Sequence, residues 1–155
     1  MRFRIRGQAP GLFRYLIGLA EDKLAIHGAR RQVATEKPGF PCRISLVDAD
    51  IGESVLLVNF EHQSAATPYR AAGPIFVREA ATQAFDAINA VPPMMRSRLL
   101  SVRAYDADGT MRDADVVDGT QFEDSIDRFF GVKETACLDA HFAKRGCFAC
   151  RIERA

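Results

Sequence analysis

Several features that would assign a class of function are missing from this sequence. No apolar run approaches the roughly 18 residues that a membrane-spanning helix needs, and the opening stretch MRFRIRGQAPG lacks the apolar core of a signal peptide. Repeats, low-complexity tracts and internal linkers are also lacking. We therefore expect one domain over residues 1–155, of a bacterial, cytoplasmic type, with no membrane partner.

Net charge is nearly absent, since Lys plus Arg (21) almost cancels Asp plus Glu (20). Such a balance creates no overall field toward nucleic acid or a membrane surface, so we expect neither as a partner. Lysine is scarce, and most cations are arginines. This bias fits a GC-rich genome, and the alternative is that several guanidinium groups bind anions. The lysines are Lys23, Lys37, Lys133 and Lys144.

Two common ligand-binding loops are absent as well. Gly7, Gly11 and Gly18 follow neither the G-x-G-x-x-G pattern nor the spacing of a P-loop. The triplet Asp-Ala-Asp occurs three times, but the copies at Asp48 and Asp106 lack the glycine and glutamate that complete a calcium loop. No cofactor is expected from these patterns.

The apolar pattern predicts an α+β domain built on a mainly antiparallel sheet with a few short helices. Phe3 and Ile5 alternate with arginines, as in a strand with one solvent face. The runs VLLVNF and GPIFVRE predict two further strands, and RRQVATEKPGFPCRISLVD is expected to be extended chain interrupted by its prolines. Hairpins are predicted about Asp108-Gly109 and over TACLDAHFAKRGCFACRIER, with Gly146 at positive φ. Short helices are expected in LFRYLIGLAEDKLAIHG and PPMMRSRLL.

One amphipathic helix stands out near residues 120–131, in TQFEDSIDRFFG. Thr120 and Glu123 have the spacing of a capping box, and Gly131 follows the last apolar residue. The apolar stripe of this predicted helix comprises Phe122, Ile126, Phe129 and Phe130.

The carboxy-terminal cysteines resemble zinc ligands in type. Cys137, His141, Cys147 and Cys150 spell C-x3-H-x5-C-x2-C. However, strand alternation in CFACRI places Cys147 and Cys150 on opposite faces, which argues against chelation. We expect four reduced cysteines and no metal site.

A nucleophilic pair is one hypothesis for catalysis. Cys42 lies beside Arg43, whose charge favours a thiolate, and His62 or His141 could serve as the base. The alternative is that Cys42 packs like a small hydrophobic residue.

Polar side chains concentrate in the segment NFEHQSAATPYRAAGPIFVRE. If its two apolar runs pair as antiparallel strands, their connection lies at one end of the sheet, a common place for binding loops. Arg70 or Arg78 would suit a carboxylate or phosphate, and His62 suits proton transfer near neutrality. Glu61 and Tyr69 add an acceptor and a donor. The alternative is a polar turn between strands.

The carboxy-terminal hairpin carries His141 next to Lys144 and Arg145. One interpretation is that His141 faces the same pocket as His62, with Lys144 as an additional ligand-binding cation, although the sequence alone does not show that the two histidines meet. The alternative is a tight turn with charged side chains at its tip.

Five stretches together are similar to one family. FRIRG, KPGFPCRISLVDA, NFEHQSAATPYRAAGPIFVRE, RAYDADGTM followed by DADVVDG, and the spaced residues H, AK, GCFA and R near the carboxy end resemble the bacterial family known as domain of unknown function 1203 (DUF1203). The resemblance extends from the first predicted strand to the last. It implies a small single-domain protein and assigns no activity, cofactor or catalytic residue.

We therefore expect a binding protein for a small anionic molecule. If it is an enzyme, its catalytic residues would be His62, His141 and Cys42. The alternative is a non-catalytic interaction or sensing module that acts through a homodimer or a partner surface. The ligand-binding residues would be Glu61, Tyr69, Arg70, Arg78 and Lys144. If the first hypothesis holds, His62, Arg70 and His141 should line one pocket.

Overall fold

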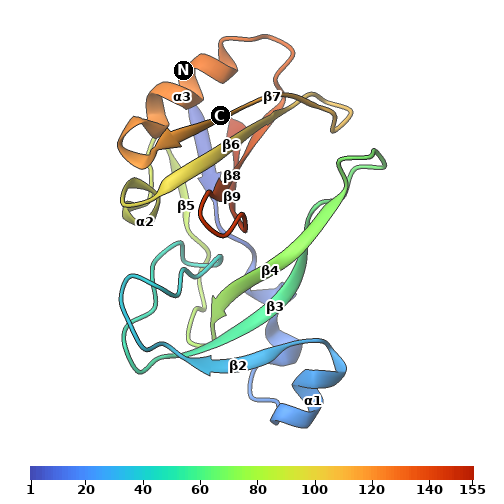
Figure 1. The fold of residues 1–155 in the computed structure, drawn as a ribbon, viewed down its shortest axis with the longest axis vertical. Coiled ribbons are helices and arrows are strands. Elements are labelled where there is room, and N and C mark those ends of the chain that lie inside the picture. The colour runs from blue at the N-terminus through green and yellow to red at the C-terminus, as the bar shows by residue number, and fades with distance from the viewer.

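The computed structural model describes all residues from 1 to 155 and contains two antiparallel sheets (Figure 1). The strands are β1 (Phe3–Arg6), β2 (Arg30–Val33), β3 (Ser54–Gln63), β4 (Ala71–Arg78), β5 (Asp86–Ile88), β6 (Leu99–Tyr105), β7 (Met111–Asp118), β8 (Cys137–Phe142) and β9 (Phe148–Arg154). The helices are α1 (Glu21–Ile26), α2 (Pro93–Arg96) and α3 (Phe122–Phe130), with 3-10 turns at Pro10–Leu12, Arg14–Leu16 and Gly119–Gln121. The larger sheet has the order β5-β1-β9-β8-β6-β7 and the smaller has the order β2-β3-β4.

The larger hydrophobic core lies between the six-stranded sheet and α3. The apolar stripe predicted for this helix is buried, and it packs with residues of β6, β8 and β9 in one cluster. Each buried phenylalanine contributes roughly 1.5–3 kcal/mol by leaving water. The structure confirms the α+β class, the mainly antiparallel strands and the amphipathic helix near 120–131.

The predicted capping box of α3 is wrong. Gly119–Gln121 forms a 3-10 turn ahead of the helix, and Asp118 accepts hydrogen bonds from the backbone N and the side-chain oxygen of Thr120, at 2.9 and 2.6 Å. Glu123 instead forms an ion pair with Arg96 at the end of α2. The 3-10 turn moves the start of the helix beyond the position that a capping box requires.

A second, smaller core lies on the three-stranded sheet. Apolar residues of β3 and β4, such as Leu56 and Ile75, pack there against Leu16 of the second 3-10 turn and Leu24 of α1. Figure 1 shows this sheet and α1 at the far end of the molecule from α3. The two cores are separate clusters, so neither of these apolar cores joins one sheet to the other.

Residues 34–53 cross that space as an irregular loop. The prediction of extended chain is correct only for β2, because after Val33 the segment contains only isolated bridges, Pro41 to Asp48 and Cys42 to Phe76. Proline removes a backbone donor and restricts φ, which works against a continuous ladder here. From this loop the Arg43 side chain reaches the start of β9, where its Nε donates to the Phe148 carbonyl at 2.7 Å.

The predicted hairpins form, and the connection between β3 and β4 contacts the turn between β6 and β7. β3 pairs with β4, and the turns at Gly109 and Gly146 have φ of 81° and 78°, which glycine adopts without strain. The Thr67 hydroxyl, between β3 and β4, donates to the carbonyl of Gly109 at 3.2 Å, so this contact joins the two sheets.

None of the helices has the length and hydropathy that a membrane crossing requires.

Candidate functional site

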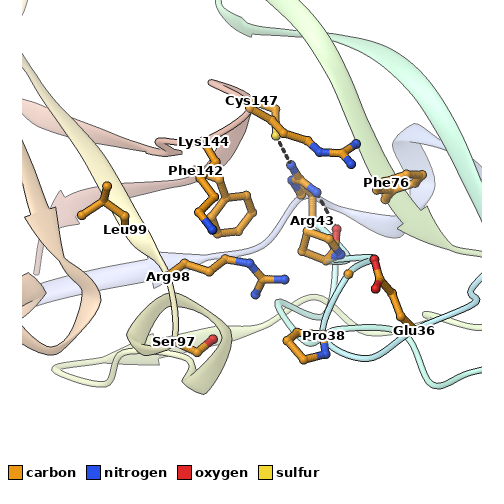
Figure 2. Close-up of a pocket in the computed structure, with 13 residues that line it drawn as sticks. Glu36, Pro38, Arg43, Phe76, Ser97, Arg98, Leu99, Phe142, Lys144 and Cys147 are labelled. Atoms are coloured by element: carbon orange, nitrogen blue, oxygen red, sulfur yellow. Dashed lines mark hydrogen bonds between the residues drawn. The ribbon is translucent and has the colours of Figure 1, made fainter.

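A cavity of about 570 Å³ opens between the two sheets (Figure 2). Its walls come from the 34–53 loop, from the start of β6 and from the β8–β9 turn. The lining residues are Glu36, Pro38, Gly39, Pro41, Arg43, Phe76, Ser97, Arg98, Leu99, Phe142, Lys144, Arg145 and Cys147.

Arg43 is the buried cation of this cavity. Its side chain is 1% exposed, yet no carboxylate pairs with it. The guanidinium donates from Nε to the Phe148 carbonyl at 2.7 Å, from Nη1 to the Pro41 carbonyl at 2.6 Å, and from Nη2 to the Cys147 sulfur at 3.1 Å. Burial lowers the pKa of Arg43, and nearby Cys147 acts in the opposite direction. The folded chain therefore carries a desolvated positive charge without a carboxylate partner.

The local backbone explains the position of Arg43. Its neighbours Cys42 and Ile44 are fully buried in the smaller core, and the Arg43 backbone N donates to the Phe76 carbonyl at 3.0 Å. With both neighbours held there, the Arg43 side chain points toward the β8–β9 turn. Its contact with the Phe148 carbonyl links the two sheets.

Three further cations line the same cavity. Arg98 is bound by Asp48 through two hydrogen bonds, at 2.6 and 2.9 Å, whereas Lys144 and Arg145 take part in none of the ion pairs of the structure. The guanidinium groups of Arg43 and Arg98 lie 5.0 and 4.8 Å from the ring centroid of Phe142. Glu36 is the one acidic residue of the lining, so positive charge is in excess.

A second cluster of functional groups lies where β3 ends beside β8. The rings of His62 and His141 are 4.9 Å apart and nearly perpendicular, and Phe148 stacks on His62 at 5.0 Å. Asp139, fully buried, completes the cluster, since potential ligand atoms of the three polar residues all lie within 4.8 Å of one another.

Both histidines occupy irregular positions in the strand pairing. The register of β3 against β4 shifts between Glu61 and Gln63, across His62, and that of β8 against β9 shifts between Ala140 and His141. Such bulges re-aim a side chain relative to the regular alternation of a strand. This local distortion brings the two rings together.

Burial controls the charge of these imidazoles. It lowers the pKa of His62, and it lowers the pKa of His141 to about 4, so both rings are neutral near pH 7. The Nδ1 atom of His141 lies 3.0 Å from the Gly146 carbonyl, while its Nε2 and the Nδ1 of His62 are buried without a hydrogen-bond partner. The cluster therefore has unused nitrogen atoms, which could accept a proton or bind a ligand.

Solvent reaches this cluster through a second, smaller cavity of about 230 Å³. His62, Phe148 and Arg151 form part of its wall. Arg151 donates to both oxygens of Asp139, at 2.7 and 3.0 Å, and to the His62 carbonyl at 3.2 Å. The cluster is thus separate from the large cavity and has its own access.

The β3–β4 connection holds its charged side chains in internal pairs. Arg70 binds Glu61, and Tyr69 packs edge-on against Tyr105 with ring centroids 6.5 Å apart. Arg70 does not line a cavity with the histidines, so the structure brings together His62 and His141 without the third predicted residue.

The remaining predicted residues lie in three different environments. Arg78 is bound to Glu53, with a shortest distance of 2.7 Å. Cys42 is fully buried, and its sulfur accepts from the Arg78 backbone N at 3.3 Å. Lys144 alone of this group lines the large cavity.

Sequence reasoning missed Arg43, Arg98 and Arg145 as cavity residues and Asp139 as a member of the histidine cluster. For two of these residues, the sequence contains a local pattern that could have identified them. Arg43 stands between apolar neighbours in FPCRIS, and Asp139 interrupts the apolar stretch CLDAHF. A charged residue inside an apolar run is either buried with partners or part of a site.

The cysteines are all free, and the two of the CxxC pattern have different surroundings. Cys150 is fully buried in the larger core, and burial raises the pKa of its thiol to about 12. Cys147 precedes β9, packs against the edge of the same core and lines the large cavity.

Comparison with known proteins connects the chain to one family. Neither the curated proteins nor the solved structures give a match. The family described as "protein of unknown function (DUF1203)" matches residues 39–154, which include the Arg43 loop, both histidines and the β8–β9 turn. The match covers most of the sequence, and on that basis the chain belongs to this family.

Proposed function

We propose that this protein binds a small anionic molecule in the cavity between its two sheets. The observation that carries the proposal is Arg43, a guanidinium that is 1% exposed and has no carboxylate partner. Burying a charge without a counterion is costly in free energy, and a bound anion at this position would offset part of that cost. Lys144 and Arg145 add positive charge at the same cavity.

The lining indicates what kind of anion would fit. A volume of about 570 Å³ is within the range of small-molecule sites. The guanidinium group of Arg43 presents planar donors that match a carboxylate or a phosphate, whereas Arg98 is already bound by Asp48. Phe76, Leu99 and Phe142 would contact an apolar part of the same ligand. We therefore expect a compact molecule with one anionic group and an apolar body.

The test is calorimetric titration of the protein with inorganic phosphate, sulfate and small carboxylates, compared with Arg43→Met and Arg70→Ala. Arg70 is the matched control because it is an arginine outside the cavity and pairs with Glu61. Binding that survives in Arg70→Ala and disappears in Arg43→Met supports the proposal. Binding of equal strength in all three proteins, or binding of none of these anions by the parent, refutes it.

An interaction surface is the second candidate function, and one feature favours it. Tyr15 and Ile26 are 60% and 74% exposed, and Tyr15 contacts His27, the residue after Ile26, edge-on. Exposed apolar groups of this kind are common at subunit interfaces. Sedimentation velocity over a range of concentrations tests it: a dimer that Ile26→Glu dissociates supports this function, and a monomer throughout rejects self-association.

A further inference from the structure

We propose that His62, His141 and Asp139 form a binding site for a divalent transition-metal ion. Two imidazole nitrogens and one carboxylate, with coordination positions left open, are a donor set typical of zinc and of non-haem iron. The predominance of nitrogen donors disfavours magnesium and calcium, which prefer oxygen ligands. This site is distinct from the anion cavity and does not depend on it.

The unpartnered nitrogens are the first observation. His141 is 1% exposed, and its Nε2 has no hydrogen-bond partner. Its Nδ1 faces the Gly146 carbonyl at 3.0 Å, so the proton resides on Nδ1 and the lone pair on Nε2. The Nδ1 of His62 is also buried and unpartnered. Buried polar atoms nearly always have a partner, so one unpartnered nitrogen on each histidine of the cluster indicates a missing ligand.

Asp139 supplies the third donor. The carboxylate is fully buried and is held by Arg151, whose Nε and Nη2 contact Oδ1 and Oδ2 at 2.7 and 3.0 Å. A carboxylate oxygen has two lone pairs, so each oxygen keeps one for a metal ion. Arg151 also donates to the His62 carbonyl at 3.2 Å, and one guanidinium therefore positions two of the three ligands. Metal ligands are commonly oriented by such outer contacts.

The backbone adds a further observation. His62 and His141 lie at register shifts in separate strand pairs, and both are directed toward Asp139. The three donor atoms lie within 4.8 Å of one another, somewhat wider than the spacing around a bound ion with ligand distances of about 2.0–2.2 Å. His62 is partly exposed at the end of β3, and a small movement of its side chain would bring the three donor atoms to the spacing that one bound ion requires.

Charge and access refine the site. Besides burial, the charges of Arg103 and Arg151 lower the pKa of His62, whereas the charge of Asp139 raises it. The surroundings of the site therefore contain two positive charges and one negative charge. A metal ion here would need an anionic ligand, such as hydroxide or a carboxylate, in one of its open positions. The cavity of about 230 Å³ that His62 lines provides the route from solvent.

Titration of tag-free protein with Co²⁺ tests the proposal, with bound metal measured by elemental analysis and geometry by visible absorption. The exposed residue His27, which ends α1, is the third histidine of the chain and supplies the matched control. We expect one ion per chain in the parent and in His27→Ala. In His62→Ala the affinity should fall by more than about 100-fold, which exceeds the effect of losing one outer contact.

A second measurement does not require a buried substitution. In the parent protein, NMR of the imidazole nitrogens during Zn²⁺ addition should shift the His141 Nε2 and His62 Nδ1 resonances and leave His27 unchanged. Asp139→Asn, which keeps the size of the side chain, should weaken Co²⁺ binding. No bound cobalt, equal binding in His62→Ala, or zinc shifts confined to His27 would overturn the proposal, and the two orphan nitrogens would then mark a water site.

Discussion

The cavity between the sheets and the β3–β4 hairpin both gather arginines, but they differ in what neutralises them. In the hairpin, Arg70 binds Glu61 and Arg78 binds Glu53. In the cavity, Arg43 has only carbonyl and sulfur acceptors. An arginine that a carboxylate already occupies has little attraction left for a ligand. We infer from this comparison that the charge balance of a region, more than its number of cations, would determine whether it can bind an anion.

Solvent exposure increases the difference. The Arg70 side chain is 63% exposed, whereas Arg43 is 1% exposed. Water screens the field of an exposed guanidinium, and a buried one acts on a ligand through a medium of lower dielectric constant.

The largest effect is expected for Arg43→Lys. A lysine keeps the charge but cannot reach two carbonyls and the cavity together, because its donors share a single atom. We expect anion affinity to fall at least about tenfold and the free energy of unfolding to fall by about 2–4 kcal/mol, since buried acceptors lose their donors. Calorimetry and urea unfolding measure the two effects. Unchanged affinity in a folded variant would place the anion elsewhere.

The double change Lys144→Ala and Arg145→Ala comes next. Neither side chain forms an ion pair, so the free energy of unfolding should stay within about 0.5 kcal/mol of the parent. Anion affinity should fall roughly 3–10-fold, and its dependence on salt concentration should become weaker. An affinity equal to that of the parent would show that these cations do not act on the ligand.

On the hairpin side, Glu53→Gln should affect stability and leave anion binding unchanged. The hydrogen bond from Arg78 holds the pKa of Glu53 below its ordinary value of 4.5. The ion pair therefore contributes stability above about pH 4.5, and this contribution disappears as the pH falls through the lowered pKa. We expect a loss of about 1–2 kcal/mol at pH 7, with parent and variant converging below pH 4.5 in thermal melts.

The smallest effect is expected for Glu61→Ala, which releases Arg70 from its partner. The pair is exposed, so the free energy of unfolding should change by no more than about 0.5 kcal/mol. Calorimetry should detect no new anion site. A site gained at Arg70 would contradict the view that an exposed arginine contributes little once it is freed.

Local patterns predict the elements of this fold well. The stripe of α3 and the turns at Gly109 and Gly146 depend on residues close together in the chain, and each forms as expected. The sequence left open whether His62 and His141 meet, and the structure places their rings side by side. Their meeting depends on long-range pairing and on two register shifts, which have no short-range sequence signature.

The large cavity was not predicted for a related reason. Arg43 belongs to an irregular loop, where neither the strand period nor the helix period shows which way a side chain points. Its partner atoms, the Phe148 carbonyl and the Cys147 sulfur, lie at the other end of the chain. By contrast, the charged groups around Glu61 and Arg70 were conspicuous in the sequence because they are neighbours in one hairpin, and that proximity lets them pair with each other.

The central claim is that the cavity attracts anions, and alkylation of Cys147 measures this directly. Iodoacetate is anionic and iodoacetamide is neutral, so the ratio of their rates at one thiol reports the local potential and is independent of the intrinsic reactivity of that thiol. Cys137, with Arg151 and the acidic residues Asp139 and Glu153 nearby, serves as the internal reference in the same digest. The account predicts a ratio at least about threefold higher at Cys147 than at Cys137. Equal ratios at the two cysteines would contradict it.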